Sequence, residues 1–222
     1  MNRVIVIAPH PDDETLGCGG TLLKHQVQGD ELYWLIVTAM RAQDGYSNAA
    51  IVQRNKEIQH VTQSYPFKEV FKLDFPAAHL DSLPLAKLVG AISDVFTKCQ
   101  PNTVYLPFPG DVHSDHKCVF DAALACTKWF RYPAVKRILA YETLSETEFG
   151  LDPTTAAFRP NVFVDISSQL DQKIAIMNIY ASELSKFPFP RSEEALRALA
   201  KLRGSTAGCA AAESFMLLKE VQ

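Results

Sequence analysis

Histidine and acidic side chains gather in one short segment near the start of this 222-residue chain. The segment Ala8–Gly20 reads APHPDDETLGCGG and places His10, Asp12, Asp13 and Glu14 within five positions. Carboxylates this close repel one another unless a cation or a proton lies among them. Because carboxylate and imidazole groups are both ligands of zinc and similar metals, the segment predicts a divalent metal site. Taken alone, it is equally consistent with a polar turn in which Asp12 or Asp13 caps the following helix.

A second segment with the same composition lies about 100 residues further along the chain. Pro107–Lys117 reads PFPGDVHSDHK and contains His113, Asp115 and His116. Because His113 and His116 stand three positions apart at the start of an expected helix, they can face the same way. The presence of two such segments favours a shared metal site over two unrelated helix caps.

Strands are expected to alternate with helices around these segments. Apolar runs predict strands at 4–7, 33–37, 69–73, 103–106, 136–141 and 162–166, and helical spacing predicts helices at 15–28, 49–63, 85–99, 115–130, 169–184 and 192–203. The alternation predicts an α/β fold in one domain over 1–222, with a doubly wound, mainly parallel sheet flanked by helices. In the strand order 3-2-1-4-5 the strands at 4–7 and 103–106 are neighbours, so the two polar segments meet where such folds bind ligands.

Two further stretches are less regular. The polar stretch 143–161, with its prolines, is expected to be a long loop and a candidate substrate lid. The small, apolar stretch 208–218 fits neither a helix nor a strand clearly.

Composition narrows the class of protein. The formal net charge is −3 and no basic run is present, which disfavours a nucleic-acid partner. The five scattered cysteines, without a CxxC pair, are typical of reduced thiols, so a cytoplasmic location is expected. No signal peptide and no apolar run of about 20 residues is present, so no membrane span is expected. A homo-oligomer is left open.

The two segments resemble the motifs of the PIG-L/LmbE family of metal-dependent de-N-acetylases. HPDDE after the first strand and HSDH after the fourth carry the resemblance, and the RxxE at Arg54 and the late segment Arg203–Phe215 are also similar to family segments. The resemblance covers nearly the whole chain and implies a Rossmann-like α/β fold, in agreement with the expected elements.

The resemblance also implies roles for individual residues. His10, Asp13 and His116 correspond to the metal ligands, and the metal is zinc, with Fe²⁺ as the alternative. Asp12 corresponds to the general base that deprotonates a metal-activated water, which attacks the acetamide carbonyl. Protonated His113 is implied to stabilise the oxyanion, with Asp115 as its orienting partner. Arg54 is similar to an arginine that contacts the sugar.

The implied substrate is a small-molecule or glycoconjugate N-acetyl sugar of the GlcNAc type. Two segments depart from the common pattern, since this chain has Thr38-Ala39-Met40 after the second strand and Tyr180-Ala181-Ser182-Glu183 in a late helix. The carrier of the sugar therefore stays open among inositol, malate, a nucleotide, a lipid phosphate and an oligosaccharide.

Two other functional classes compete with the deacetylase. Gly17, Gly19 and Gly20 follow the first strand, as in a dinucleotide-binding domain, but the GxGxxG pattern would need glycine where Leu22 stands. These glycines are better explained by close packing of the helix on the sheet. A non-catalytic metal-binding protein would need the ligands but not the accompanying base.

Overall fold

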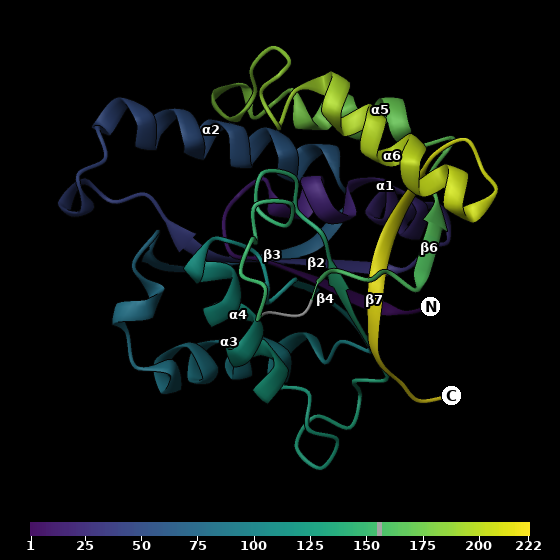
Figure 1. Cartoon of the computed structure of the whole chain (residues 1–222). Helices are drawn as coiled ribbons and strands as arrows, with labels where there is room; N and C mark the ends of the chain where they lie inside the picture. The colour runs from purple at the N-terminus through teal and green to yellow at the C-terminus, as the bar shows by residue number, and fades with distance from the viewer. Residues whose placement is uncertain (155–156) are drawn as a thin grey trace.

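A computed structural model describes residues 1–154 and 157–222, and these form a seven-stranded sheet with helices on both faces (Figure 1). The spatial order of the strands is β3-β2-β1-β4-β5-β7-β6. The strands are β1 (Arg3–Ala8), β2 (Glu31–Ala39), β3 (Phe67–Pro76), β4 (Thr103–Pro107), β5 (Arg137–Tyr141), β6 (Val162–Asp165) and β7 (Ala212–Glu220). The first five strands are parallel, whereas β7 runs antiparallel to both β5 and β6.

The helices are distributed over the two faces of the sheet. They are α1 (Asp13–Val27), α2 (Asn48–Ser64), α3 (Leu85–Cys99), α4 (Ser114–Ala125), α5 (Leu170–Met177) and α6 (Glu193–Ala207), with short 3₁₀ turns at Ala42–Asp44, Leu80–Ser82 and Ala181–Glu183. Figure 1 shows α1, α2, α5 and α6 on one face and α3 and α4 on the other. This is the predicted α/β fold, with a mainly parallel sheet between two layers of helices.

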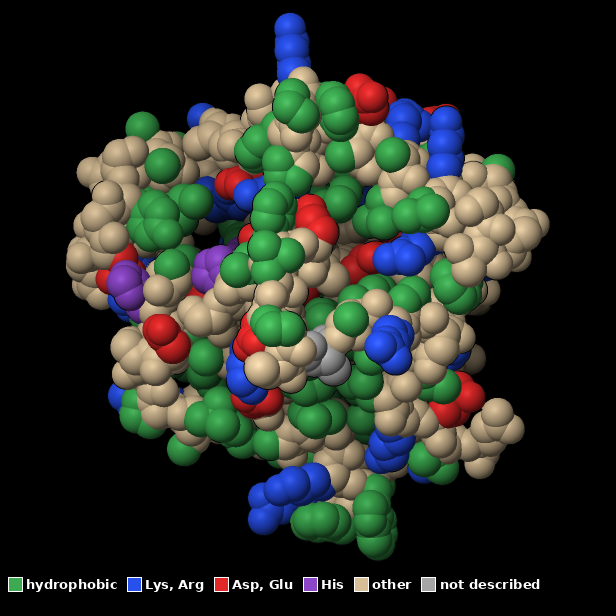
Figure 2. All heavy atoms as spheres, in the orientation of Figure 1, with side chains coloured by type: hydrophobic (Ala, Val, Ile, Leu, Met, Phe, Trp, Pro, Cys, Tyr) green, Lys and Arg blue, Asp and Glu red, His purple; other side chains and the backbone are tan. Residues whose placement is uncertain are grey.

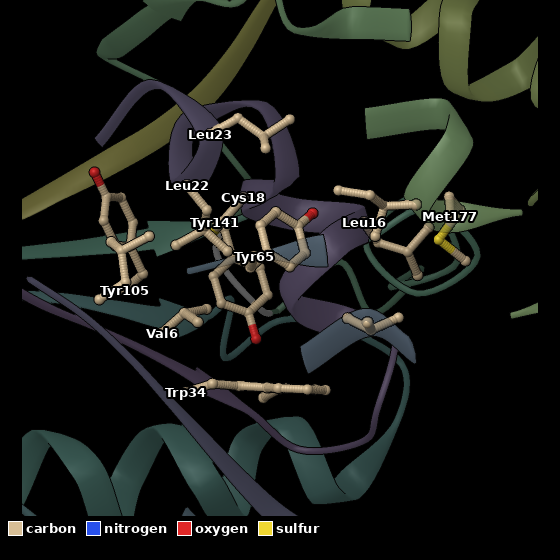
Figure 3. Packing of buried hydrophobic residues seen from close by; sticks show 14 of the residues in the cluster. Val6, Leu16, Cys18, Leu22, Leu23, Trp34, Tyr65, Tyr105, Tyr141 and Met177 are labelled. Carbon is tan, nitrogen blue, oxygen red and sulfur yellow. The ribbon is translucent and has the colours of Figure 1, made fainter. Parts of the chain in front are cut away.

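The pleat of the central strands divides the hydrophobic core into two clusters. Val4 and Val6 of β1 pack on the α1 face together with Trp34 of β2, whereas Ile5 and Ile7 pack on the α3 and α4 face. Successive side chains of a strand point to opposite faces, so a strand covered on both sides must be apolar throughout. Figure 3 shows the first cluster, in which Trp34, Tyr105 and Tyr141 from the sheet and Tyr65 from the end of α2 pack together with apolar residues of α1.

Close packing fixes the position of α1 and therefore of the turn that precedes it. A Cβ at Gly17 would overlap the ring of Tyr141, and one at Gly20 would lie 2.7 Å from Ile166. The hydroxyl of Tyr141 donates to the carbonyl of Ile7 at 2.8 Å, which joins β5 to β1 beneath the helix. The glycines after β1 therefore allow close approach of helix and sheet, as expected from the sequence.

The predicted neighbourhood of the first and fourth strands is confirmed. Val4 pairs with Thr103 and Val6 with Tyr105, so β1 and β4 run side by side and end at the same edge of the sheet. The chain leaves β1 toward β2 on one side and returns to β4 on the other, which produces a crevice at their carboxyl ends.

The C-terminal part of the chain differs from the sequence-based expectation. The helix expected over 169–184 ends at Met177, and the chain then turns so that Ser182 and Glu183 reach polar partners on α2. The helix expected over 115–130 ends at Ala125. The unassigned stretch 208–218 contains most of β7, whose insertion between β5 and β6 depends on distant pairing and has no local signature.

Among the described residues, no helix combines the length and the hydrophobicity needed to cross a bilayer. The segment 143–161, which is predicted to be a lid, is only partly described, because residues 155 and 156 lie outside the described residues.

Candidate active site

The two predicted segments meet at the carboxyl ends of β1 and β4. The ring of His10 lies 4.5 Å from that of His113 and 5.6 Å from that of His116, measured between centroids. His10 and Asp13 follow β1, whereas His113 and His116 lie at the start of α4. The topology therefore brings together side chains that are about 100 residues apart in the sequence.

Three of these side chains direct ligand atoms toward one point. His10 Nδ1 and His116 Nε2 each lie 3.4 Å from Asp13 Oδ2. The ligand atoms of the three residues lie within 4.8 Å of one another, which is compatible with a single metal ion. Asp13 Oδ2 also accepts a hydrogen bond from the backbone N–H of His10 at 2.8 Å, which fixes the orientation of the carboxylate.

The remaining nitrogen of each histidine is bound to a second carboxylate. His10 Nε2 lies 3.0 Å from Asp115 Oδ2, and His116 Nδ1 lies 2.7 Å from Asp111 Oδ2. The inner nitrogen of His116 is buried and has no hydrogen-bond partner among the described residues. A buried polar atom without a partner is costly, and a cation between the two histidines and Asp13 would remove that cost. The three side chains thus fit a catalytic metal that keeps further positions open.

The pKa shifts of these side chains in the metal-free chain also indicate a site for a cation. Burial alone would lower the pKa of His10, but hydrogen bonds to Asp115 and Asp13 raise it to about 9. Burial would raise the pKa of Asp13, yet the charge of His116 and the contacts with both histidines hold it below its usual range. Protons on the histidines thus compensate the buried carboxylate. A divalent cation would displace these protons on binding.

Asp12 lies beside the three converging side chains, but its carboxylate is not one of the three ligand groups. Its carboxylate accepts a hydrogen bond from Arg191 Nη1 at 3.0 Å, and the same nitrogen donates to Glu183 at 3.1 Å. Burial and the charge of Asp13 raise the pKa of Asp12, against the opposing charge of Arg191. The backbone of Asp12 has φ 126° and ψ −30°, in a region that residues other than glycine rarely occupy. Such strain is typical of functional positions.

Glu14, the third carboxylate of the first segment, faces the core. It accepts hydrogen bonds from the Tyr180 hydroxyl at 2.9 Å, from the Thr15 hydroxyl at 2.6 Å and from the Asp12 backbone at 3.1 Å. Burial raises its pKa to about 7 despite these bonds. Glu14 therefore stabilises the turn through its hydrogen bond with the Asp12 backbone and does not line the cavity.

Asp115 and His113 are arranged differently from the expected pair. The Asp115 carboxylate contacts His10 and accepts the backbone N–H groups of Ala78 at 2.7 Å and Leu80 at 3.0 Å. His113 instead caps α4, with its Nδ1 accepting the backbone N–H of Asp115 at 3.1 Å. The expected carboxylate contact with His113 is replaced because these two backbone N–H groups and His10 hold the carboxylate.

This arrangement determines the protonation of His113. Burial and the charge of His10 lower its pKa to about 4. The ring is therefore neutral at pH 7, and since Nδ1 accepts a hydrogen bond, the proton is on Nε2. In the metal-free chain this favours a neutral N–H donor, and the protonated His113 that the family resemblance implies stays a prediction.

Arg54 is predicted to contact a sugar, yet most of its guanidinium is engaged by the protein. It donates to the carbonyl of Pro11 at 2.6 Å, pairs with Glu183, and lies 3.1 Å from Glu57. Only 6% of the residue is exposed. Arg54 thus holds the HPDD turn in place and reaches the cavity wall at the same time.

A cavity of about 210 Å³ opens directly above these groups. On the face shown in Figure 2, a hollow lies beside a histidine, with acidic and basic side chains at its rim. Besides the predicted residues His10, Asp12, Asp13, Arg54 and His113, the lining includes Met40, Tyr46, Lys72, Glu146, Glu183 and Arg191.

Sequence reasoning missed Asp111, Glu183 and Arg191. Asp111 stands five positions before His116 in the same polar segment, Pro107–Lys117, which was a usable signal. Glu183 lies in the 3₁₀ turn Ala181–Glu183 and Arg191 in a loop, and both reach the site only through the fold, so no local spacing could have indicated them. Arg191 follows residues 187–190, an aromatic and proline-rich stretch that carries no chemical motif of its own.

The fold and the site together define an α/β protein with a candidate three-ligand His/Asp metal centre. Residues 5–127, more than half of the chain, match the sequence model of the PIG-L family, described as GlcNAc-PI de-N-acetylase. The chain therefore belongs to the PIG-L/LmbE family of deacetylases.

Individual relatives agree with this assignment. The chain is 27% identical to a diacetylchitobiose deacetylase of Thermococcus kodakarensis over 94% of this chain and 80% of that protein. Among solved structures, it resembles the conserved protein TT1542 from Thermus thermophilus, with 27% identity, a TM-score of 0.79, and coverage of 100% and 97% of the two chains. An N,N'-diacetylchitobiose deacetylase from Pyrococcus horikoshii shares the fold, with 21% identity, a TM-score of 0.78, and coverage of 97% and 83%.

Proposed function

We propose that this chain is a metal-dependent amidohydrolase that removes the acetyl group from an N-acetylated amino sugar in a GlcNAc-type conjugate. The observation that carries the proposal is the convergence of His10 Nδ1, His116 Nε2 and Asp13 Oδ2 on one point beside a cavity. Zinc fits this set of nitrogen and oxygen ligands, with Fe²⁺ as the alternative. Residues 1–222 are proposed to act as one domain, because the site draws on segments from both ends of the chain.

The metal would supply Lewis acidity to the acetamide carbonyl and lower the pKa of a water molecule. Asp12 is placed to accept a proton from the attacking water, because its carboxylate lines the cavity and is not among the three converging ligands. The same carboxylate then returns the proton to nitrogen as the C–N bond breaks. The products are acetate and the free amine of the sugar.

His113 is proposed to stabilise the negative charge that develops on the carbonyl oxygen. Its Nε2–H is available because Nδ1 is already bound to the Asp115 backbone. A neutral donor fits a site that also holds a divalent cation, because a second positive charge would be repelled. Asp115 is proposed to act indirectly, by binding Nε2 of the metal ligand His10 and so orienting its ring.

Arg54 and Arg191 are proposed to shape the sugar side of the cavity. Both guanidinium groups line it, and both are held by Glu183. The sugar class rests on the family description and on the relatives named as diacetylchitobiose deacetylases. Among possible carriers of the sugar, an oligosaccharide is the one that these relatives favour.

The proposal is tested by measuring acetate release from a panel of neutral and anionic GlcNAc conjugates. The panel contains N,N'-diacetylchitobiose, a GlcNAc-inositol glycoside and a GlcNAc-malate glycoside, each incubated with zinc-loaded wild-type protein and with Asp12→Ala. We expect acetate from at least one conjugate, with a loss of about 10²–10⁴-fold in the variant. Equal release by wild type and variant would show that Asp12 is not the base. No release from any N-acetyl sugar would refute the proposed activity.

A further inference from the structure

The carboxylate of Asp111 takes no part in the chemistry proposed for Asp12 and His113. Its side chain is fully buried, and both of its oxygens are used by side chains. Oδ2 binds His116 Nδ1 at 2.7 Å, and Oδ1 accepts the hydroxyl of Thr147 at 2.6 Å. No hydrogen bond from a backbone N–H to this carboxylate is found among the described residues. An aspartate that merely capped a turn would accept such a bond.

Thr147 is in turn part of a tightly hydrogen-bonded turn. Its hydroxyl accepts the backbone N–H of Thr143 at 2.8 Å, and its own N–H donates to the carbonyl of Thr143 at 2.9 Å. The carbonyl of Glu146 accepts the N–H of Val112, next to Asp111, at 3.2 Å. The turn after β5 and the turn after β4 are therefore joined both by backbone and by side chains.

The same turn forms part of the cavity wall. Thr143, Ser145 and Glu146 are among the residues that line the cavity. A chain of hydrogen bonds thus runs from the wall through Thr147 and Asp111 to His116, whose inner nitrogen faces Asp13. The wall and the candidate metal ligand form one connected unit.

We propose that Asp111 is a positioning residue that fixes the ring of His116 for metal binding, and that Thr147 holds Asp111 in turn. Because a carboxylate accepts but cannot donate, Asp111 requires the proton of neutral His116 on Nδ1 and leaves the Nε2 lone pair free for the metal. Carboxylates that hold the outer nitrogen of a ligating histidine typically change metal affinity by about 10–100-fold when replaced. This proposal rests on the proposed metal-dependent function.

The test is the zinc affinity of the full-length, metal-free protein, measured by equilibrium competition with a chromophoric chelator. We expect Asp111→Asn and Asp111→Ala to bind zinc about 10–100-fold more weakly than wild type. Thr147→Val should weaken binding to a smaller extent, and Thr147→Ser should restore it because the hydroxyl is kept. Thermal unfolding of each variant confirms that it is folded.

Asp30→Asn provides a matched control. Asp30 binds His25 Nδ1 at 2.8 Å in a similarly close aspartate–histidine pair, at the opposite end of β2 from the site. Its replacement should leave the zinc affinity unchanged. If Asp30→Asn and the Asp111 variants weaken zinc binding equally, or if folded Asp111 variants bind zinc as wild type does, the positioning role is refuted. If wild-type protein itself binds no zinc, the proposed function fails first, so the two failures are distinguishable.

Discussion

Replacing Asp12 by glycine is expected to give a more stable protein than replacing it by alanine, although both variants lose the proposed base. Both changes remove the same carboxylate and its bond to Arg191. They differ in the backbone, because Asp12 has φ 126°, which glycine adopts without a steric penalty. The comparison therefore isolates the strain at this position.

The magnitude follows from two opposing contributions. A non-glycine residue held at such φ and ψ values costs about 1–3 kcal/mol. Glycine loses about 0.5–1 kcal/mol more backbone entropy on folding. Asp12→Gly should therefore be more stable than Asp12→Ala by roughly 1 kcal/mol, or about 2–4 °C in Tm for a chain of this size.

Urea unfolding of both variants, monitored by circular dichroism, measures the difference directly. Asp121 in α4 provides a control in ordinary helical backbone, where the order should reverse and glycine should be less stable than alanine by about 1 kcal/mol. If Asp12→Ala is as stable as Asp12→Gly or more so, while the Asp121 pair behaves as expected, the strain argument is refuted.

Two further predictions concern Arg54 and His25. Arg54→Ala should lower the free energy of unfolding by about 3 kcal/mol, because it leaves the buried carboxylate of Glu57 without its cation and removes one of the two arginines that bind Glu183. The more solvent-accessible pair of Arg41 and Asp44 should matter less, so Arg41→Ala is the control in the same denaturation assay. Burial lowers the pKa of His25 below its usual value, so the unfolded chain binds the proton more readily. The contribution of neutral His25 to the free energy of unfolding is therefore complete above about pH 6.5 and is lost as the pH falls toward the pKa of His25 in the folded chain. Between pH 7 and pH 5, the free energy of unfolding should change less for His25→Gln than for wild type.

The sequence predicted the residues that local rules can place. His10, Asp13 and His116 follow apolar runs that form adjacent parallel strands, so their meeting followed from the general topology of doubly wound sheets. The helices α1, α2 and α3 were expected within a few residues of their observed bounds, because the spacing of apolar residues and the residues at helix ends are local signals.

The rest depends on contacts between distant segments. Glu183 leaves the expected helix because Arg54 and Arg191 bind it, and no spacing in the late segment indicates that pairing. The Asp115 carboxylate contacts His10 because the backbone of 78–80 lies next to it, a neighbour that the sequence does not show. The strand β7 is similarly defined by pairing with β5 and β6.

The metal content of the purified protein tests the central claim most directly. Inductively coupled plasma mass spectrometry of wild type should find about one zinc or iron per chain, because three ligand atoms converge beside the cavity. Asp13→Ala should contain none, since Asp13 Oδ2 lies 3.4 Å from a nitrogen of each histidine ligand. Asp12→Ala should retain the metal and lose about 10²–10⁴-fold in activity. Absence of metal from wild type even after reconstitution, or full metal content in Asp13→Ala, would contradict the proposed metal centre.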